Sequence, residues 1–300
     1  MYSALSAVLF QDSLRTVPQQ EDKPFWAAYG VDNDTSSAPD ILLISMVLFN
    51  SFLESVKSSV DTAVDTATPQ NAIDSRFSPW LTPLVYPLAR RIVLPFYFGK
   101  IEVTGQENLP ITGPVILAPT HRARWDAIMV PYATGRTVTG RDLRFMVTAD
   151  EVKGIQGWFI RRLGGFPVNT KRPTVASLRH GVEVLQNGEM LVIFPEGGIF
   201  RDGQLHPLKP GLGRLAIQAE MSQPGLGVQV VPIALDYGEA FPTRGCNVKI
   251  QIGKPLKVAN YVQGAAKQGA KRFTADLEAA LRALAGEATE AEAEMLSAFG

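Results

Sequence analysis

A histidine and an aspartate with four residues between them form the part of the chain best suited to chemistry. His121 follows an apolar segment, residues 113–119, that indicates a buried strand, and Asp126 lies at the start of a helical segment, residues 125–133. An imidazole at a strand exit can accept a proton from a hydroxyl, and a nearby carboxylate can orient it and stabilise the imidazolium. The pattern predicts His121 as a general base and Asp126 as its partner.

A second block, residues 164–172, ends in two adjacent cations. Lys171 and Arg172 follow a segment rich in glycine and proline, Gly-Gly-Phe-Pro-Val, that suggests a turn. Two cations on such a turn can bind a phosphate by charge-assisted hydrogen bonds. The alternative is a solvated basic turn before a helix that begins near residue 174.

A third block lies about seventy residues after His121. An apolar strand runs into Phe194-Pro-Glu-Gly-Gly-Ile-Phe-Arg-Asp-Gly203, which contains Glu196, Gly197 and Arg201, and Lys209 follows shortly afterwards. A fourth block, Val231-Pro-Ile-Ala-Leu235, is apolar throughout and is explained equally well as a core strand.

Together, and in this order, the four blocks resemble the phospholipid/glycerol acyltransferase family. Its signatures are His-x4-Asp and a downstream Phe-Pro-Glu-Gly, both present here, and Lys209 and Gly211 match positions that often follow. Two arginines that the family commonly carries are replaced, by Thr170 in the second block and by Ile199 in the third. The resemblance covers roughly residues 100–235.

The resemblance implies an O-acyltransferase similar to 1-acylglycerol-3-phosphate acyltransferases. These enzymes move a fatty acyl group from acyl-CoA or acyl carrier protein to lysophosphatidate in phospholipid biosynthesis, by direct attack and without an acyl-enzyme. It implies substrate-binding roles for a set of residues in which the displaced cations replace the usual arginines: Lys171, Arg172, Glu196, Gly197, Arg201 and Lys209. No cofactor and no metal are expected beyond the acyl carrier as co-substrate.

Other functions fit the same blocks. The acceptor can instead be glycerol 3-phosphate, another lysophospholipid or a neutral lipid alcohol. A hydrolase would release fatty acid without an acceptor, and a lipid-binding protein could use the scaffold without catalysis. His180 and His206 have no carboxylate at the spacing seen for His121, so both are expected to be structural or solvated.

Composition limits the partners and the compartment. The 300 residues carry a formal net charge of zero, which gives no general attraction for nucleic acid. Cys246 is the single cysteine, so no internal disulfide can form and a reducing environment is favoured. We expect Cys246 to be a small strand residue and not a nucleophile.

Two apolar segments predict a membrane surface as a partner. Residues 41–49 are too short to span a bilayer, and residues 80–98 contain Arg90, Arg91 and three prolines. Aromatic residues around central arginines suit attachment within the interface, so we expect a monotopic protein on the cytoplasmic side of a membrane. The alternative is that residues 80–98 pack on the protein's own core. We identify no secretory signal at the start of the chain.

Alternating strand and helix patterns from residue 76 onward predict an α/β fold. Strands are expected at 101–103, 115–118, 144–147, 190–194, 228–235 and 248–252, with helices at 175–185, 212–219 and 273–284. This order predicts a central, mostly parallel or mixed sheet flanked by helices. Residues 1–75 are expected to form an N-terminal extension with a helix at 41–56, and residues 76–300 the acyltransferase domain.

Overall fold

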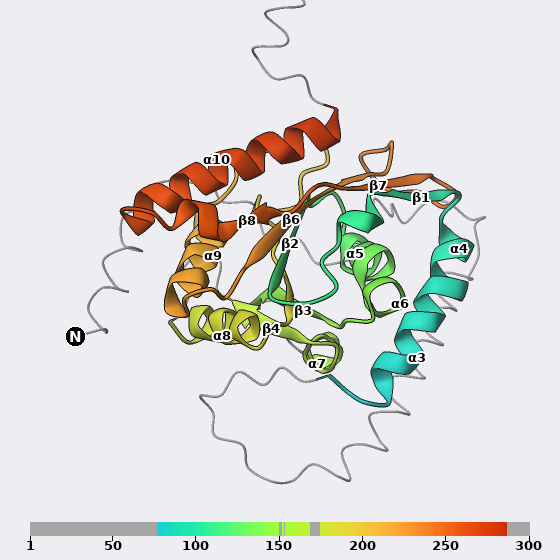
Figure 1. Ribbon diagram of the computed structural model, residues 1–300. Helices are drawn as coiled ribbons and strands as arrows, with labels where there is room; N and C mark the ends of the chain where they lie inside the picture. Colours follow the sequence, from blue (N-terminus) through green and yellow to red (C-terminus); the bar gives the residue numbers. More distant parts are fainter. Residues whose placement is uncertain (1–76, 150–151, 153, 169–174, 287–300) are drawn as a thin grey trace, which may run out of the picture. The chain divides into compact units, whose positions relative to one another are not determined.

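The protein has an α/β fold built on one eight-stranded sheet, as the sequence predicts (Figure 1). The computed structural model describes residues 77–149, 152, 154–168 and 175–286. The N-terminal extension therefore lies outside the described residues, and both its helix at 41–56 and the division at residue 75 stay predictions.

The strands follow the order β1-β7-β6-β2-β5-β3-β4, with β8 paired to β6. Their bounds are β1 Ile101–Thr104, β2 Val115–Pro119, β3 Leu143–Thr148, β4 Gly165–Val168, β5 Met190–Val192, β6 Gln229–Asp236, β7 Val248–Ile252 and β8 Leu256–Lys257. All neighbouring strands pair in parallel, β6 with β2 included, apart from two antiparallel pairs. These are the pairs of β6 with β7 and of β6 with β8. The sheet is therefore mixed.

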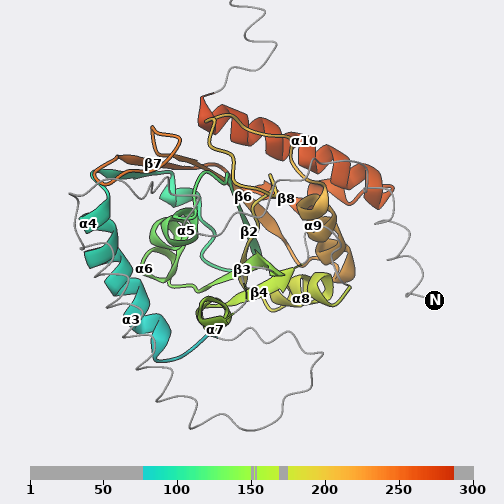
Figure 2. The same ribbon diagram turned by 180° about the vertical axis from the view of Figure 1, so that it is seen from behind.

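Two layers of helices enclose the sheet (Figures 1 and 2). The α-helices are α3 Leu81–Leu88, α4 Leu94–Tyr97, α5 Asp126–Thr134, α6 Arg136–Thr139, α7 Gly154–Arg162, α8 Val175–Gln186, α9 Gly211–Ser222 and α10 Ala266–Ala285. Short 3-10 turns are η4 Gln106–Asn108 and η6 Val258–Tyr261.

Strand β2 is central because it contributes to both hydrophobic cores. Ile116 and Ala118 pack into the core formed with α8, α9 and α10, whereas Val115 and Leu117 pack into the core on the side of α4 and α5. All five of its residues are buried. Period-2 alternation in a strand covered on both faces explains why this segment is apolar at every position.

Residues 81–97 stay helical despite their prolines. A π-helical turn, η3 Ala89–Val93, joins α3 to α4, and the Leu94 N–H donates across five residues to the Ala89 carbonyl. Such a wide turn relieves the clash that a proline ring makes with the preceding turn, here the ring of Pro95. The prolines of this segment therefore do not end the helix.

The second block holds a strand that the sequence did not predict. Gly165 to Val168 form edge strand β4, paired in parallel with β3. The pattern suggested a turn because Gly164, Gly165 and Pro167 are poor strand residues, but edge strands tolerate proline. Gly164 does mark the bend, with a left-handed φ of 87°.

Candidate active site

The end of β2 fixes the position of His121. The Thr120 N–H donates to the Ile233 carbonyl at 2.9 Å, and the Leu235 N–H donates to Thr120 Oγ1 at 2.9 Å. These two bonds continue the pairing with β6 to the last residue before His121. The histidine is therefore held at the carboxyl end of a central parallel strand, where open α/β sheets place their ligands.

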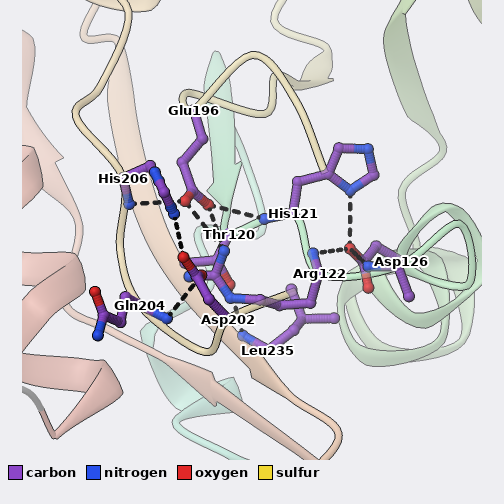
Figure 3. A network of polar contacts seen from close by, with 10 residues as sticks. Thr120, His121, Arg122, Asp126, Glu196, Asp202, Gln204, His206 and Leu235 are labelled. Atoms are coloured by element: carbon purple, nitrogen blue, oxygen red, sulfur yellow. Dashed lines mark hydrogen bonds and ion pairs between the residues drawn. The ribbon is translucent and has the colours of Figure 1, made fainter. Parts of the chain in front are cut away.

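His121 and Asp126 form the predicted pair (Figure 3). His121 Nδ1 lies 2.8 Å from Asp126 Oδ2, and Asp126 is completely buried at the start of α5. A carboxylate there is stabilised by the helix dipole and favours the tautomer in which Nδ1–H donates a hydrogen bond to it, which leaves Nε2 with a free lone pair. The geometry is that of a general base with an orienting carboxylate.

The ring of His121 is fixed by stacking and opens to solvent on one side. Its centroid lies 3.9 Å from that of Phe194, with the rings 21° from parallel, and the side chain is 19% exposed. The second ring nitrogen faces away from Asp126 (Figure 3). The nitrogen that would accept a substrate proton is therefore the one that Asp126 does not occupy.

Glu196 is a buried link between the two loops that carry the motifs. Arg122 donates to both of its carboxylate oxygens at 3.0 Å, and the backbone N–H groups of His121 and His206 each donate to one oxygen at 3.0 Å. Glu196 is 1% exposed. Because protein donors occupy both oxygens, this geometry supports a positioning role, while the predicted substrate-binding role stays a prediction.

Gly197 and Lys209 lie together beside Glu196. Gly197 has a left-handed φ of 72°, and a Cβ there would come within 3.0 Å of Lys209 Cγ. The Lys209 N–H donates to the Pro195 carbonyl at 2.8 Å, and its side chain is exposed. The glycine thus lets a cationic side chain cross the turn, consistent with the predicted binding role of Lys209.

Arg201 lies one residue from a backbone contact with the base. The Phe200 N–H donates to the His121 carbonyl at 2.9 Å, and the Arg201 guanidinium lies 4.8 Å from the ring centroid of the exposed Phe241. Its charge is therefore exposed near the mouth of the site. Lys171 and Arg172 lie outside the described residues, so their predicted role is untested.

The other two histidines also lie near carboxylates. His206 Nε2 lies 2.7 Å from Asp202 Oδ2, and the pair lowers the pKa of Asp202 through the hydrogen bond from the imidazole. Asp202 precedes His206 by four residues, so this contact does not have the spacing of His121 and Asp126. His180 Nδ1 lies 3.6 Å from Glu183.

Sequence reasoning missed Arg122 and Tyr237. Arg122 lies between the two motif residues, but nothing in the local pattern indicates a buried arginine. Tyr237 extends the alternation of Val231, Ile233 and Leu235 past the end of β6 on the same core face. That alternation was the available signal for Tyr237, whose hydroxyl reaches Asp126.

A family model described as Acyltransferase matches residues 100–236 of the chain. This stretch contains the His121 and Glu196 motifs and ends at the last residue of β6.

The chain is also similar to named acyltransferases. The chain is 30% identical over 175 residues to a chloroplastic 1-acyl-sn-glycerol-3-phosphate acyltransferase of Arabidopsis thaliana, covering 55% of this chain and 45% of that protein. It is 27% identical over 191 residues to the enzyme of that name from Bacillus subtilis, covering 62% and 88%. The chain thus spans less than half of the plant protein.

A solved structure shares the fold. The 1-acyl-sn-glycerophosphate acyltransferase of Thermotoga maritima aligns with a TM-score of 0.52 at 20% identity, covering 69% of this chain and 81% of that one. This agreement supports the mixed sheet flanked by helices.

Proposed function

We propose that the protein is an O-acyltransferase that moves a fatty acyl group from acyl-CoA or acyl carrier protein to the free hydroxyl of 1-acyl-sn-glycerol 3-phosphate. The observation that carries the proposal is the 2.8 Å contact between His121 Nδ1 and the buried Asp126, in a histidine whose side chain is 19% exposed. The names of the similar proteins supply the substrate class.

The reaction proceeds by direct transfer. His121 Nε2 accepts the proton of the acceptor hydroxyl as its oxygen attacks the thioester carbonyl carbon. The C–S bond of the tetrahedral intermediate then breaks, and the leaving thiolate takes the proton from the imidazolium. The products are the ester and the free thiol, and Asp126 stabilises the transient imidazolium throughout.

One assay tests the acceptor and the donor together. Purified protein with lipid vesicles receives labelled acyl-CoA or acyl carrier protein thioester and one acceptor from a panel. We expect transfer to lysophosphatidate above transfer to glycerol 3-phosphate or a neutral alcohol. Glycerol 3-phosphate is the second candidate because relatives named glycerol-3-phosphate acyltransferase also match, at 27% identity over 154 residues in one case. Release of free fatty acid without an acceptor would indicate a hydrolase instead.

The surface of the α3–η3–α4 helix suits a membrane partner. Trp80, Leu84, Leu88, Ile92 and Phe96 recur every four residues and are 38% to 61% exposed. Residues at this spacing share one face of a helix. Among the described residues, no helix is long and apolar enough to cross a bilayer. An exposed apolar row on a short helix suits attachment within one leaflet.

The two arginines at the centre of the α3–η3–α4 helix, Arg90 and Arg91, differ in their contacts. Arg90 donates to the Tyr132 carbonyl at 2.9 Å and lies over the Tyr132 ring, so it ties this helix to α5. Arg91 is exposed and free to meet lipid headgroups. One side of this helix therefore packs on the protein's own core, and the exposed apolar row on the other side supports the proposed membrane attachment.

Charges placed on the exposed row should release the protein from membranes. We expect Ile92→Asp/Phe96→Asp to lower the vesicle-bound fraction at least tenfold in co-sedimentation, because each large apolar side chain contributes about 1.5–3 kcal/mol when buried. Ile111→Asp is the matched control, since Ile111 is 70% exposed outside this helix. If the double variant and Ile111→Asp lose vesicle binding equally, the helix is not the surface that binds the membrane.

Arg201 is expected to bind the acceptor's phosphate. Arg201→Ala should raise the KM for lysophosphatidate about ten- to a hundredfold, because it removes one charge-assisted hydrogen bond to the phosphate. The KM for the thioester should change little. Arg172→Ala should act in the same direction. Arg244→Ala is the control, because its guanidinium also lies over an exposed ring, that of Phe96, at 4.3 Å. Acceptor kinetics like wild type in both test variants would place the phosphate site elsewhere.

A further inference from the structure

Asp126 is bound by more donors than the histidine alone. Its Oδ2 accepts from His121 Nδ1 at 2.8 Å and from the backbone N–H groups of Arg122 at 2.7 Å and Ala123 at 2.9 Å. Its Oδ1 accepts from the Tyr237 hydroxyl at 2.6 Å. The first oxygen is therefore fixed by its own loop, and the second by a residue 111 positions away.

The sheet determines where Tyr237 points. Alternate residues of β6, Val231, Ile233 and Leu235, face the core that contains α5, and Tyr237 continues this alternation one step beyond the strand. Phe98 packs beside it with ring centroids 6.0 Å apart, and Tyr237 is 3% exposed. Its buried hydroxyl therefore reaches the Asp126 oxygen that the loop donors leave unused.

The phenol is a donor under all ordinary conditions. Burial, followed by the negative charge of Asp126, raises the pKa of Tyr237 far above its usual range. Because the phenol stays protonated and Asp126 is the acceptor of its hydrogen bond, the carboxylate is held by donors on both oxygens. A carboxylate held in this way keeps one oxygen directed at the imidazole.

We propose that Tyr237 is a positioning residue for the acyl transfer, which fixes Asp126 through Oδ1 and so sets the orientation and basicity of His121. The inference rests on the proposed function for its kinetic consequence, although the contact itself does not depend on the substrate. A donor to the carboxylate draws charge away from the oxygen that faces the imidazole. Removing that donor strengthens the attraction between Asp126 and a protonated His121.

Several other titratable groups lie near the side chains of Tyr237 and His121. Asp126 faces both, and Arg122 and Glu196 lie behind the backbone of His121. Tyr237 also borders an open hollow whose titratable lining residues are Lys100, Glu102, Asp236, Glu239, Cys246 and Lys249. Asp126 is the group that both Tyr237 and His121 contact. We therefore expect the hydroxyl to act on His121 through Asp126.

The first test measures the titration of His121 without any substrate. The sequence has three histidines, so selective 13C labelling gives three imidazole signals that His→Ala variants assign. In Tyr237→Phe we expect the His121 pKa to be higher than in wild type, with His180 and His206 unchanged. A His121 curve that coincides with or lies below that of wild type overturns the proposal, even in a protein that fails every acyl-transfer assay.

The second test measures turnover. Tyr237→Phe should lower kcat about tenfold, with the KM for both substrates within about twofold and the acid limb of the pH–rate profile moved upward. In an Asp126→Asn background the same change should alter kcat by less than about twofold, since coupled residues are not additive. Full additivity would mean that Tyr237 does not act through Asp126.

Tyr261→Phe is the matched control. The Tyr261 hydroxyl donates to Asp276 at 2.7 Å, so the substitution removes the same kind of bond away from the dyad. It should move neither the His121 titration nor kcat. Circular dichroism and thermal unfolding report on folding in each variant. A Tyr237→Phe protein that does not fold also overturns the proposal, because the hydroxyl would then act on the fold and not on the dyad.

Discussion

His121→Ala is expected to lower kcat by about 10²–10⁴-fold or more, the range that a general base contributes. The fold should remain, because the ring is near the surface and the backbone contacts of residue 121, from its N–H to Glu196 and from Phe200 to its carbonyl, do not need the imidazole. Steady-state rates with saturating donor and lysophosphatidate give the result. Circular dichroism confirms that the variant is folded.

His206→Ala is the matched control for that variant. His206 also contacts an aspartate, at 2.7 Å, and also stacks on a phenylalanine, Phe200, at 3.8 Å between centroids. Its imidazole is outside the proposed mechanism, so its loss should change kcat by less than about threefold. If His121→Ala keeps more than about a tenth of wild-type turnover, His121 is not the base.

Asp126→Asn should also lower kcat, for a different reason. The amide keeps the shape of the side chain but offers one acceptor oxygen to the four donors that reach Asp126, and it cannot balance an imidazolium charge. We therefore expect a loss in kcat with the KM for the thioester unchanged.

Local patterns predicted the sheet well because strand and helix signals act over short distances. Buried β2 and alternating β7 were found within one or two residues of their ends, since an uninterrupted apolar run or strict period-2 alternation has few alternatives. Strand β5 ends at Val192, two residues earlier than expected, although the Ile193 N–H still donates to the Leu117 carbonyl before the turn begins at Pro195. Helix α10 begins at Ala266, where a polar first turn hides the periodicity.

Contacts between distant segments could not be predicted in this way. The His121 motif carries its own partner five residues away, so one segment shows both. Tyr237 reaches the same carboxylate from 111 residues away, and Arg122 finds Glu196 across 74 residues. Such pairs depend on strand order, in which β6 lies beside β2, and that order follows from how the whole sheet is assembled.

The largest expected effect on stability is the loss of the buried ion pair. Arg122→Met should lower the free energy of unfolding by about 3–5 kcal/mol, because it leaves the carboxylate of Glu196 buried with two backbone donors and no countercharge. Urea unfolding followed by circular dichroism measures the change in midpoint. Turnover should fall as well, since Glu196 binds the backbone N–H of His121.

Two comparisons separate the buried charge from the lost side chain. Lys100→Met breaks a pair with Glu102 in which the side chains are 74% and 47% exposed, so it should leave the urea midpoint almost unchanged. Arg122→Met/Glu196→Gln should be more stable than Arg122→Met, because the amide still accepts a backbone hydrogen bond and carries no charge. If the double variant is less stable than the single one, the penalty comes from lost packing of the arginine, and Glu196 does not need a countercharge to hold the two motif loops together.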